Sequence, residues 1–513
     1  MNIFSLDRLP NETLSEIFAH CIPTCAKDSR PTPTNAPLQL SQVSSQWRAV
    51  TRRTPHLWTS LNISRGHKLR GQTDFRNPTI RTPSQLVDRL QSVIDESTFH
   101  AQRWIDLSQS LPLRLWIEFP AVPMHEAKFR HAEEVVSDMW REFLRWIIRG
   151  QQERICFLHV DDQLSSALDG VIDSSSVFPI LRTLSLDIQG GKLDDFRRHG
   201  SLKMFPLLEN ASLDLHSKIM TQTGPLVFAR LLPLQNLTRL SILSSYRWTF
   251  LVKILERCTS LVELMAEVAD VEHGQLGLAG VPMVVLPHLK SLDLLFRDRE
   301  EAGLLAHLHC PSLETLAMRR FNGVDWSNRL VFEHQLPFDC SLSQLHSLTL
   351  SQGSTTSAAQ LVACLASTVN LVKLELESNP VDYDFLFHRL ATDSAIVPRL
   401  RLFSLGLRLR PLERMRAGGK FTWSQFKSMI ETRYDLNPNN AANVSGWIVH
   451  AYLSIHHPYA ERATKGELGT SVWDEAGRYT GPLGRVSDIL TVEGDEVSSG
   501  VWKLPYPLWV SEM

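Results

Sequence analysis

Cysteine and histidine are the residues of this chain that could form a metal site or a catalytic pair, and their spacing supports neither. Cys21 and Cys25 are separated by three residues, but no second cysteine pair or His-x-x-x-His follows at the spacing of a structural zinc site. His456 and His457 have no acidic or cysteine neighbours at ligand spacing, and we expect them in a loop. The sequence therefore predicts no bound metal.

Phosphate-binding and cofactor-binding motifs are also missing from the sequence. The chain contains no Walker-type loop and no G-x-G-x-x-G motif, and its two Gly-Gly pairs, 190–191 and 418–419, are typical of turns. Nothing in the sequence points to a cysteine or serine paired with a histidine as a nucleophile. We expect no cofactor and no enzymatic activity.

The overall composition indicates a folded chain with no general attraction to polyanions. The chain has 513 residues, of which 43% are hydrophobic and 21% charged, a length that predicts more than one domain or one elongated repeat domain with a small head. Lys plus Arg is 53 and Asp plus Glu is 55, which gives a net charge of −2. This balance argues against nucleic acid or a membrane surface as the partner.

Cysteine usage and the N-terminal sequence bear on the compartment. The seven cysteines are odd in number and irregular in spacing, which favours free thiols over a disulfide framework. The first dozen residues contain charges and no apolar segment of the kind found in signal peptides. We expect a cytoplasmic or nuclear protein.

The first sixty residues show two apolar stripes at helical spacing. The first follows Pro10, which suits the first turn of a helix, and Pro23 ends it. A loop rich in proline, serine and threonine follows, from Thr24 to Pro37. The second stripe ends before Pro55. We predict one helix for each stripe, and the stripes consist of Leu14, Ile17, Phe18 and Cys21, and of Leu40, Val43, Trp47 and Val50.

The combination of these residues resembles the F-box, a small helical module. The matching segments are Leu9-Pro10-x-Glu12-x-Leu14-x-x-Ile17-Phe18, Leu40-x-x-Val43-x-x-x-Trp47-Arg48, and Pro55-His56-Leu57-Trp58-Thr59-Ser60-Leu61. The last segment resembles the form that is abundant in fungal F-box proteins. The resemblance covers about a tenth of the chain. The loop from Thr24 to Pro37 is several residues longer than the compact family pattern, which bears on the register of the second helix.

The F-box resemblance implies a partner and a role for individual residues. In the family, this module docks onto a Skp-type adaptor protein and through it onto a cullin, in a ubiquitin ligase. The residues implied to bind the adaptor are Leu9, Pro10, Leu14, Ile17, Leu40 and Val43. The residues implied to form the module's core are Phe18, Trp47 and Trp58.

A leucine-patterned repeat follows in the body of the chain. The template Leu-x-x-Leu-x-Leu begins nine times, at successive intervals of 24 to 32 residues. All but one of these intervals lie within the range of about 20–29 residues that is typical of leucine-rich repeats. Its starts are Leu181, Leu208, Leu237, Leu261, Leu289, Leu313, Leu345, Leu371 and Leu400. Each repeat predicts a short strand and a return segment whose apolar side is buried only by stacking on its neighbours. We therefore predict an α/β solenoid whose parallel strands line a concave face, with helices on the convex face.

On such strands, the residues beside the second and third template positions point away from the core. Several of them are acidic, so we hypothesise that the concave face binds a protein target that presents Lys or Arg. The alternative is that these acids only keep the sheet soluble. The candidate target-binding residues are Asp187, Asp214, Glu263, Glu267, Asp293 and Arg319.

The sequence thus predicts four regions and an adaptor function. The regions are an F-box-like helical domain at 1–62, a polar basic linker and entry segment at 63–103, a leucine-rich-repeat-like solenoid at 104–410, and a capping helix with an irregular tail at 411–513. We expect a non-catalytic substrate receptor that binds a Skp-type adaptor and holds a protein substrate for degradation. The alternative is a repeat scaffold with a degenerate F-box and no ligase role.

Overall fold

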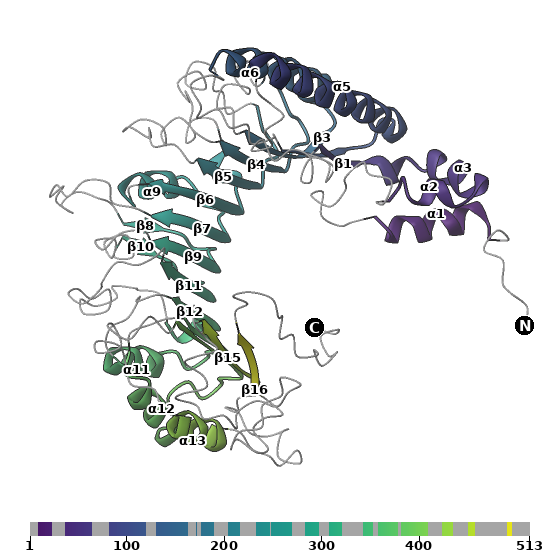
Figure 1. Cartoon of the computed structure of the whole chain (residues 1–513). Coiled ribbons are helices and arrows are strands. Elements are labelled where there is room, and N and C mark those ends of the chain that lie inside the picture. Colours follow the sequence, from purple (N-terminus) through teal and green to yellow (C-terminus); the bar gives the residue numbers. More distant parts are fainter. Residues whose placement is uncertain are drawn as a thin grey trace, which may run out of the picture. The chain divides into compact units, whose positions relative to one another are not determined.

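The computed structural model in Figure 1 consists of two compact units. The first contains residues 1–246 and 253–261, and the second contains residues 247–252 and 262–513. No helix among the described residues is both long and apolar enough to cross a membrane. The structure describes residues 9–22, 36–63, 82–118, 130–162, 171, 176–188, 204–215, 232–246, 248–268, 283–296, 307–320, 342–351, 358–377, 381–408, 423–433, 450–456 and 490–494.

Three short helices and a 3-10 turn form the N-terminal head of the first unit. They are α1 (Asn11–His20), α2 (Leu40–Val43), α3 (Ser45–Arg53) and η3 (Pro55–Trp58). The prediction of one helix from Leu40 to Val50 is wrong, because the chain is extended at Ser44, with φ −151° and ψ 170°. The hydroxyl of Ser44 accepts a hydrogen bond from the Trp47 amide at 3.2 Å and caps α3.

A long helix, α5 (Pro83–Ser108), connects the first two strands of the sheet, β1 (Ser60–Ile63) and β2 (Leu113–Glu118). Thr82 caps it, since the hydroxyl accepts from the Gln85 amide while the Gln85 side chain accepts from the Thr82 amide, both at 3.3 Å. The apolar segment 104–107, at the start of the predicted solenoid range, lies within this helix. Strand β2 is followed by α6 (Arg130–Leu144), the π-helical turn η5 (Arg145–Arg149) and β3 (Ile155–Asp162).

The strands of each unit form a parallel sheet in sequence order (Figure 1). In the first unit, β1, β2 and β3 are followed by β4 (Thr183–Ile188), β5 (Asn210–Leu215) and β6 (Arg239–Tyr246). In the second unit the order is β7 (Glu263–Val268), β9 (Ser291–Phe296), β11 (Thr315–Arg320), β12 (Ser347–Ser351), β13 (Lys373–Glu377), β14 (Leu402–Arg408), β15 (His450–His456) and β16 (Leu490–Gly494). A separate two-stranded ladder pairs β8 (Val284–Val285) with β10 (Leu308–His309).

Each of the nine leucine templates gives one of these strands, which confirms the predicted repeat. Every strand from β4 to β14 in the main sheet begins two residues after the first template position. All twenty-seven template side chains are at most 4% exposed, so they form the core on which neighbouring repeats stack. Backbone bonds repeat with the same period: the amide of Glu314 donates to Lys290, and that of His346 donates to Glu314, both at 2.8 Å.

The sheet also includes strands outside the expected solenoid range of 104–410. Strand β1 precedes that range, and β15 and β16 follow it, with β14 pairing β15 and β15 pairing β16 in parallel. His456, expected in a loop, is the last residue of β15. Both Gly-Gly pairs, Cys25 and most of the basic segment 64–82 lie outside the described residues.

Helices cover one face of the strands in each unit (Figure 1). In the first unit α5 packs on α6. In the second, α12 contacts both α11 and α13. The helices of the repeat region are α9 (Trp248–Leu255), α11 (Ala358–Ser367), α12 (Tyr383–Thr392) and α13 (Trp423–Arg433).

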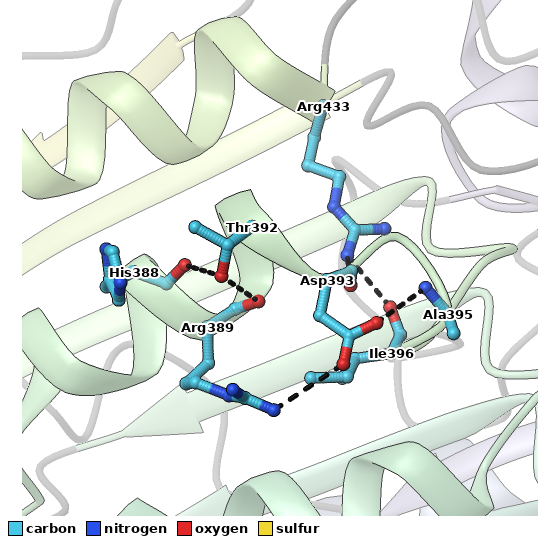
Figure 2. Close-up of polar contacts among 7 residues, drawn as sticks. All are labelled: His388, Arg389, Thr392, Asp393, Ala395, Ile396 and Arg433. Atoms are coloured by element: carbon cyan, nitrogen blue, oxygen red, sulfur yellow. Dashed lines mark hydrogen bonds and ion pairs between the residues drawn. The ribbon is translucent and has the colours of Figure 1, made fainter.

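Arg433, at the end of α13, closes the C-terminal end of α12 (Figure 2). Its guanidinium donates to the backbone oxygens of Leu390 at 2.6 Å, Asp393 at 2.7 Å and Ile396 at 3.0 Å. Only 7% of the residue is exposed, and burial lowers the pKa of its side chain. Helix C-termini leave carbonyl groups without intrahelical partners. By donating to carbonyl groups at the end of α12, Arg433 joins α13 to the preceding repeat.

Candidate functional surfaces

The interior of the head is built from aromatic and apolar side chains of α1 and α3. Phe18 is fully buried and its ring packs on that of Trp47, with centroids 4.8 Å apart and planes at 53°. Trp47 itself is half-buried. A hydrogen bond of 3.1 Å between the hydroxyls of Ser15 and Thr54 joins α1 to the end of α3. Both Phe18 and Trp47 thus occupy positions consistent with the core role that the resemblance implies.

Apolar residues are exposed on both α1 and α2 of the head. Ile17 is 42% exposed, Val43 is 60% exposed, and Pro10 is exposed at the start of α1. Leu9 and Leu40 are half-buried. Burying these side chains in a complex would be favourable, because each fully buried aliphatic side chain contributes about 1.5–3 kcal/mol. These five residues, Leu9, Pro10, Ile17, Leu40 and Val43, are called the apolar head surface below.

Leu14 does not belong to the apolar head surface, which corrects the expectation that it binds a partner. Its side chain is only 1% exposed. Residues four apart share one face of a helix, so Leu14 lies on the buried face with Phe18. Ile17 instead shares its face with Thr13 and Cys21, both of which are exposed.

The head is joined to the sheet by direct packing and by strand pairing. The indole of Trp58, 1% exposed, donates to the Thr51 oxygen at 2.8 Å, and its ring packs edge-on against Trp104 of α5, with centroids 4.8 Å apart. The Arg114 amide donates to the Thr59 oxygen at 2.8 Å. Strand β1 then pairs with β2 from Ser60 to Ile63. The head and the first strands therefore form one packed structure.

The structure brings Asp187 and Asp214 together with two carboxylates that sequence reasoning missed. Register pairs Asp187 with Asp214 on β5 and with Asp161 on β3, and pairs Asp161 with Glu118 on β2. All four residues are half-buried. The apolar run at 155–160 is a degenerate copy of the template, Ile155-x-x-Leu158-x-Val160, with Ile and Val at two of the three leucine positions, and Asp161 follows it directly. We call these four carboxylates the acidic row.

An aromatic row lies beside the acidic row. The rings of Trp116 and His159 stack with centroids 3.6 Å apart and planes at 22°, and His159 Nδ1 is 2.8 Å from the hydroxyl oxygen of Ser185. The Trp116 indole donates to Oε1 of Glu118 at 2.7 Å. The guanidinium of Arg114 lies 5.4 Å from the centroid of the Phe157 ring, in cation–π contact.

The remaining predicted acids fall in the second unit, where they differ in exposure. Glu263 is half-buried. Glu267 is only 4% exposed, which corrects the expectation that it is available to a target; its register partner on β9 is Leu295. Asp293 forms a 3.2 Å ion pair with Arg319, and burial raises the pKa of Asp293 although Arg319 opposes that shift.

The second unit also contains a carboxylate, Glu375, that pairs with a lysine on the same strand. The Lys373 ammonium lies 2.8 Å from Glu375, and the Thr349 hydroxyl donates to the same carboxylate at 2.7 Å. Burial alone would raise the pKa of Glu375, but these hydrogen bonds outweigh it and the pKa is lowered. Asp293 and Glu375 are thus each paired with a base, Asp293 with Arg319 on the neighbouring strand β11 and Glu375 with Lys373 on its own strand.

Two buried cysteines of the repeat region are poorly suited to act as nucleophiles. Burial raises the pKa of Cys258 to about 12 and that of Cys364 to about 11, so both are thiols at neutral pH. Within the described part of the chain, no three His, Cys, Asp or Glu side chains are placed to hold a metal ion.

Comparison with known proteins identifies the head. A protein-family model described as F-box-like matches residues 6–64. This segment is an F-box-like domain. No curated protein sequence matches the chain. Among solved structures, an internalin from Listeria monocytogenes is similar at 12% identity and a TM-score of 0.33, covering 77% of this chain and 97% of the internalin.

The F-box-like domain thus contains the apolar head surface and is continuous with the leucine-rich-repeat-like sheet. Its last strand, β1, is also the first strand of that sheet. Trp58, implied by the resemblance to hold the module together, fastens the F-box-like domain to α5.

Proposed function

We propose that this chain is a substrate-receptor subunit of a cullin-type ubiquitin ligase. The F-box-like domain binds a Skp-type adaptor protein, and the repeat domain holds a protein target close to the ubiquitin-conjugating enzyme that other subunits bring. The chain contributes proximity and no chemistry of its own. The observation that carries the proposal is the apolar head surface, with Ile17 and Val43 exposed on a domain whose family docks through this region.

Exposure of these side chains supports the adaptor-binding role of the head over a role in packing alone. A degenerate F-box used only for packing would bury Leu9, Pro10 and Ile17 against the repeats. In the structure Pro10 and Ile17 are exposed and Leu9 is half-buried, while the packing against α5 uses Trp58. The exposed residues are therefore free to contact an adaptor without disturbing the junction with the sheet.

The test is capture of a purified Skp-type adaptor by the full chain and by its Leu9→Ala/Pro10→Ala variant. We expect the intact chain to bind and the double variant to bind at least tenfold more weakly, a loss of about 1.4 kcal/mol. Val135→Ala is the matched control, since Val135 is 47% exposed on α6, away from the head. A folded full chain that captures no adaptor would refute the proposal and leave a repeat scaffold.

A further inference from the structure

The apolar head surface is divided between two parts of the chain that both pack on α3. Leu9, Pro10 and Ile17 lie at the start of α1 and along it, whereas Leu40 and Val43 are the first and last residues of α2. Helix α3 packs against α1 and against α2. The placement of the two parts therefore depends on the contacts that α3 makes with each of them.

On the α2 side, α3 supplies a hydrogen-bond donor to the end of a very short helix. Helix α2 ends at Val43 because the chain is extended at Ser44, which leaves its last carbonyl groups without intrahelical partners. Nε of Arg48 donates to the backbone oxygen of Ser41 at 3.0 Å. The guanidinium charge at the C-terminal end of a helix is also favourable. A single helical turn is unstable by itself in water, so α2 depends on contacts of this kind.

On the α1 side, α3 holds the residues at which the helix begins. The side-chain nitrogen of Gln46 donates to the backbone oxygen of Leu9 at 3.5 Å and to Oδ1 of Asn11 at 3.4 Å. A carbonyl oxygen can only accept, so the nitrogen of the Gln46 amide, and not its oxygen, must face Leu9. Pro10 is the N-cap of α1 and makes no side-chain capping bond. Gln46 thus provides a polar contact at a helix start that has no cap of its own.

We propose that Gln46 and Arg48 are positioning residues for adaptor binding. Gln46 holds the Leu9–Pro10 part of the apolar head surface in place, and Arg48 holds α2 with its two residues of that surface. The inference rests on the proposed function and assigns the residues that set the shape of its binding surface. Two parts that are already in place bind a partner with a smaller loss of conformational freedom than two mobile parts. Each residue acts through the part that it holds.

The experiment is calorimetric titration of the full chain with a purified Skp-type adaptor. Arg48→Met removes the donor to α2, and Gln46→Glu replaces the donor to Leu9 with a group that repels its oxygen. We expect each variant to bind about fivefold more weakly, the usual effect of losing one hydrogen bond, while the melting temperature of the chain is unchanged. Arg48→Lys should restore part of the affinity. Arg52→Met is the matched control, because it removes the same charge from an exposed residue of the same helix.

Double-mutant cycles separate positioning from direct contact with the adaptor. Arg48→Met should cause no further loss of affinity when both surface residues of α2 are already alanine, and its full loss when Leu9 and Pro10 are alanine. Gln46→Glu should show the reverse pattern. Equal losses in the two backgrounds would overturn the proposal, since they would indicate direct contact or a general loosening of the head. Unchanged affinity in both single variants would overturn it as well.

The titration of the unvaried chain distinguishes failure of this inference from failure of the proposed function. An unvaried chain that binds the adaptor, with variants that lack the crossed pattern, contradicts only the positioning roles of Gln46 and Arg48. A folded, unvaried chain that binds no adaptor contradicts the ligase role, and the positioning roles with it.

Discussion

Trp104→Ala should weaken adaptor binding, although Trp104 lies in α5 and outside the F-box-like domain. The two rings at the junction are almost fully buried, with Trp58 1% and Trp104 2% exposed, and their centroids are 4.8 Å apart. Truncating a buried tryptophan to alanine costs about 3–5 kcal/mol. A small helical module buries little surface by itself, so the head and β1 should open locally with a population raised by about a hundredfold or more.

Hydrogen exchange of the full chain, followed by mass spectrometry, measures that opening directly. We expect faster exchange in residues 45–63 and weaker adaptor capture, with exchange in the second unit unchanged. Trp104→Phe is the matched control. The Trp104 indole N–H has no hydrogen-bond partner among the described residues, so phenylalanine keeps much of the ring contact and loses no hydrogen bond. Unchanged exchange in 45–63 for the alanine variant would refute the view that α5 supports the head.

Two further perturbations concern the second unit. Arg433→Gln should destabilise the contact between α12 and α13 by about 3 kcal/mol, because it leaves buried carbonyl groups without their donor. Faster proteolysis between residues 393 and 433 would show this, and Arg433→Lys should restore the stability only in part. Glu375→Gln should lower the melting temperature at pH 7, whereas Asp293→Asn should not. The pKa of Glu375 is lowered, so its stabilisation is complete above its unfolded pKa and is lost as pH falls through the folded value. The pKa of Asp293 is raised, so its ionised form lowers the stability of the fold at neutral pH, and that destabilisation disappears as pH falls below its unfolded pKa. Calorimetry that finds a lower melting temperature for Asp293→Asn than for Glu375→Gln at pH 7 would contradict both assignments.

The nine repeat strands could be predicted because each leucine of the template marks a side chain that must be buried. At Leu289, Leu292 and Leu294, as at the other eight copies, the three apolar positions have no alternative to an inward orientation. The strands that escaped prediction lack this template. β1 follows a proline-initiated turn, and β15 and β16 lie in a tail of mixed composition, where pairing with an existing sheet edge decides the structure.

Other features depend on local hydrogen bonds or on neighbours that are distant in sequence. The break between α2 and α3 is set by one side chain, Ser44, whose capping bond outweighs the apolar spacing of Leu40, Val43 and Trp47. The start of α5 could have been found from Thr82-Pro83-Ser84-Gln85, a capping box with proline in the first turn. The burial of Glu267 could not, because the alternation along its strand predicts an outward side chain there, yet only 4% of the residue is exposed.

The central claim is that the apolar head surface binds a Skp-type adaptor in the intact chain. Hydrogen exchange of the full chain, with and without saturating adaptor, tests it most directly. We predict slower exchange on adaptor binding in residues 9–22 and 36–46, and loss of that protection in Ile17→Asp but not in Val135→Asp. Protection confined to the repeat sheet, or no protection by an adaptor that binds a known F-box protein, would contradict the account.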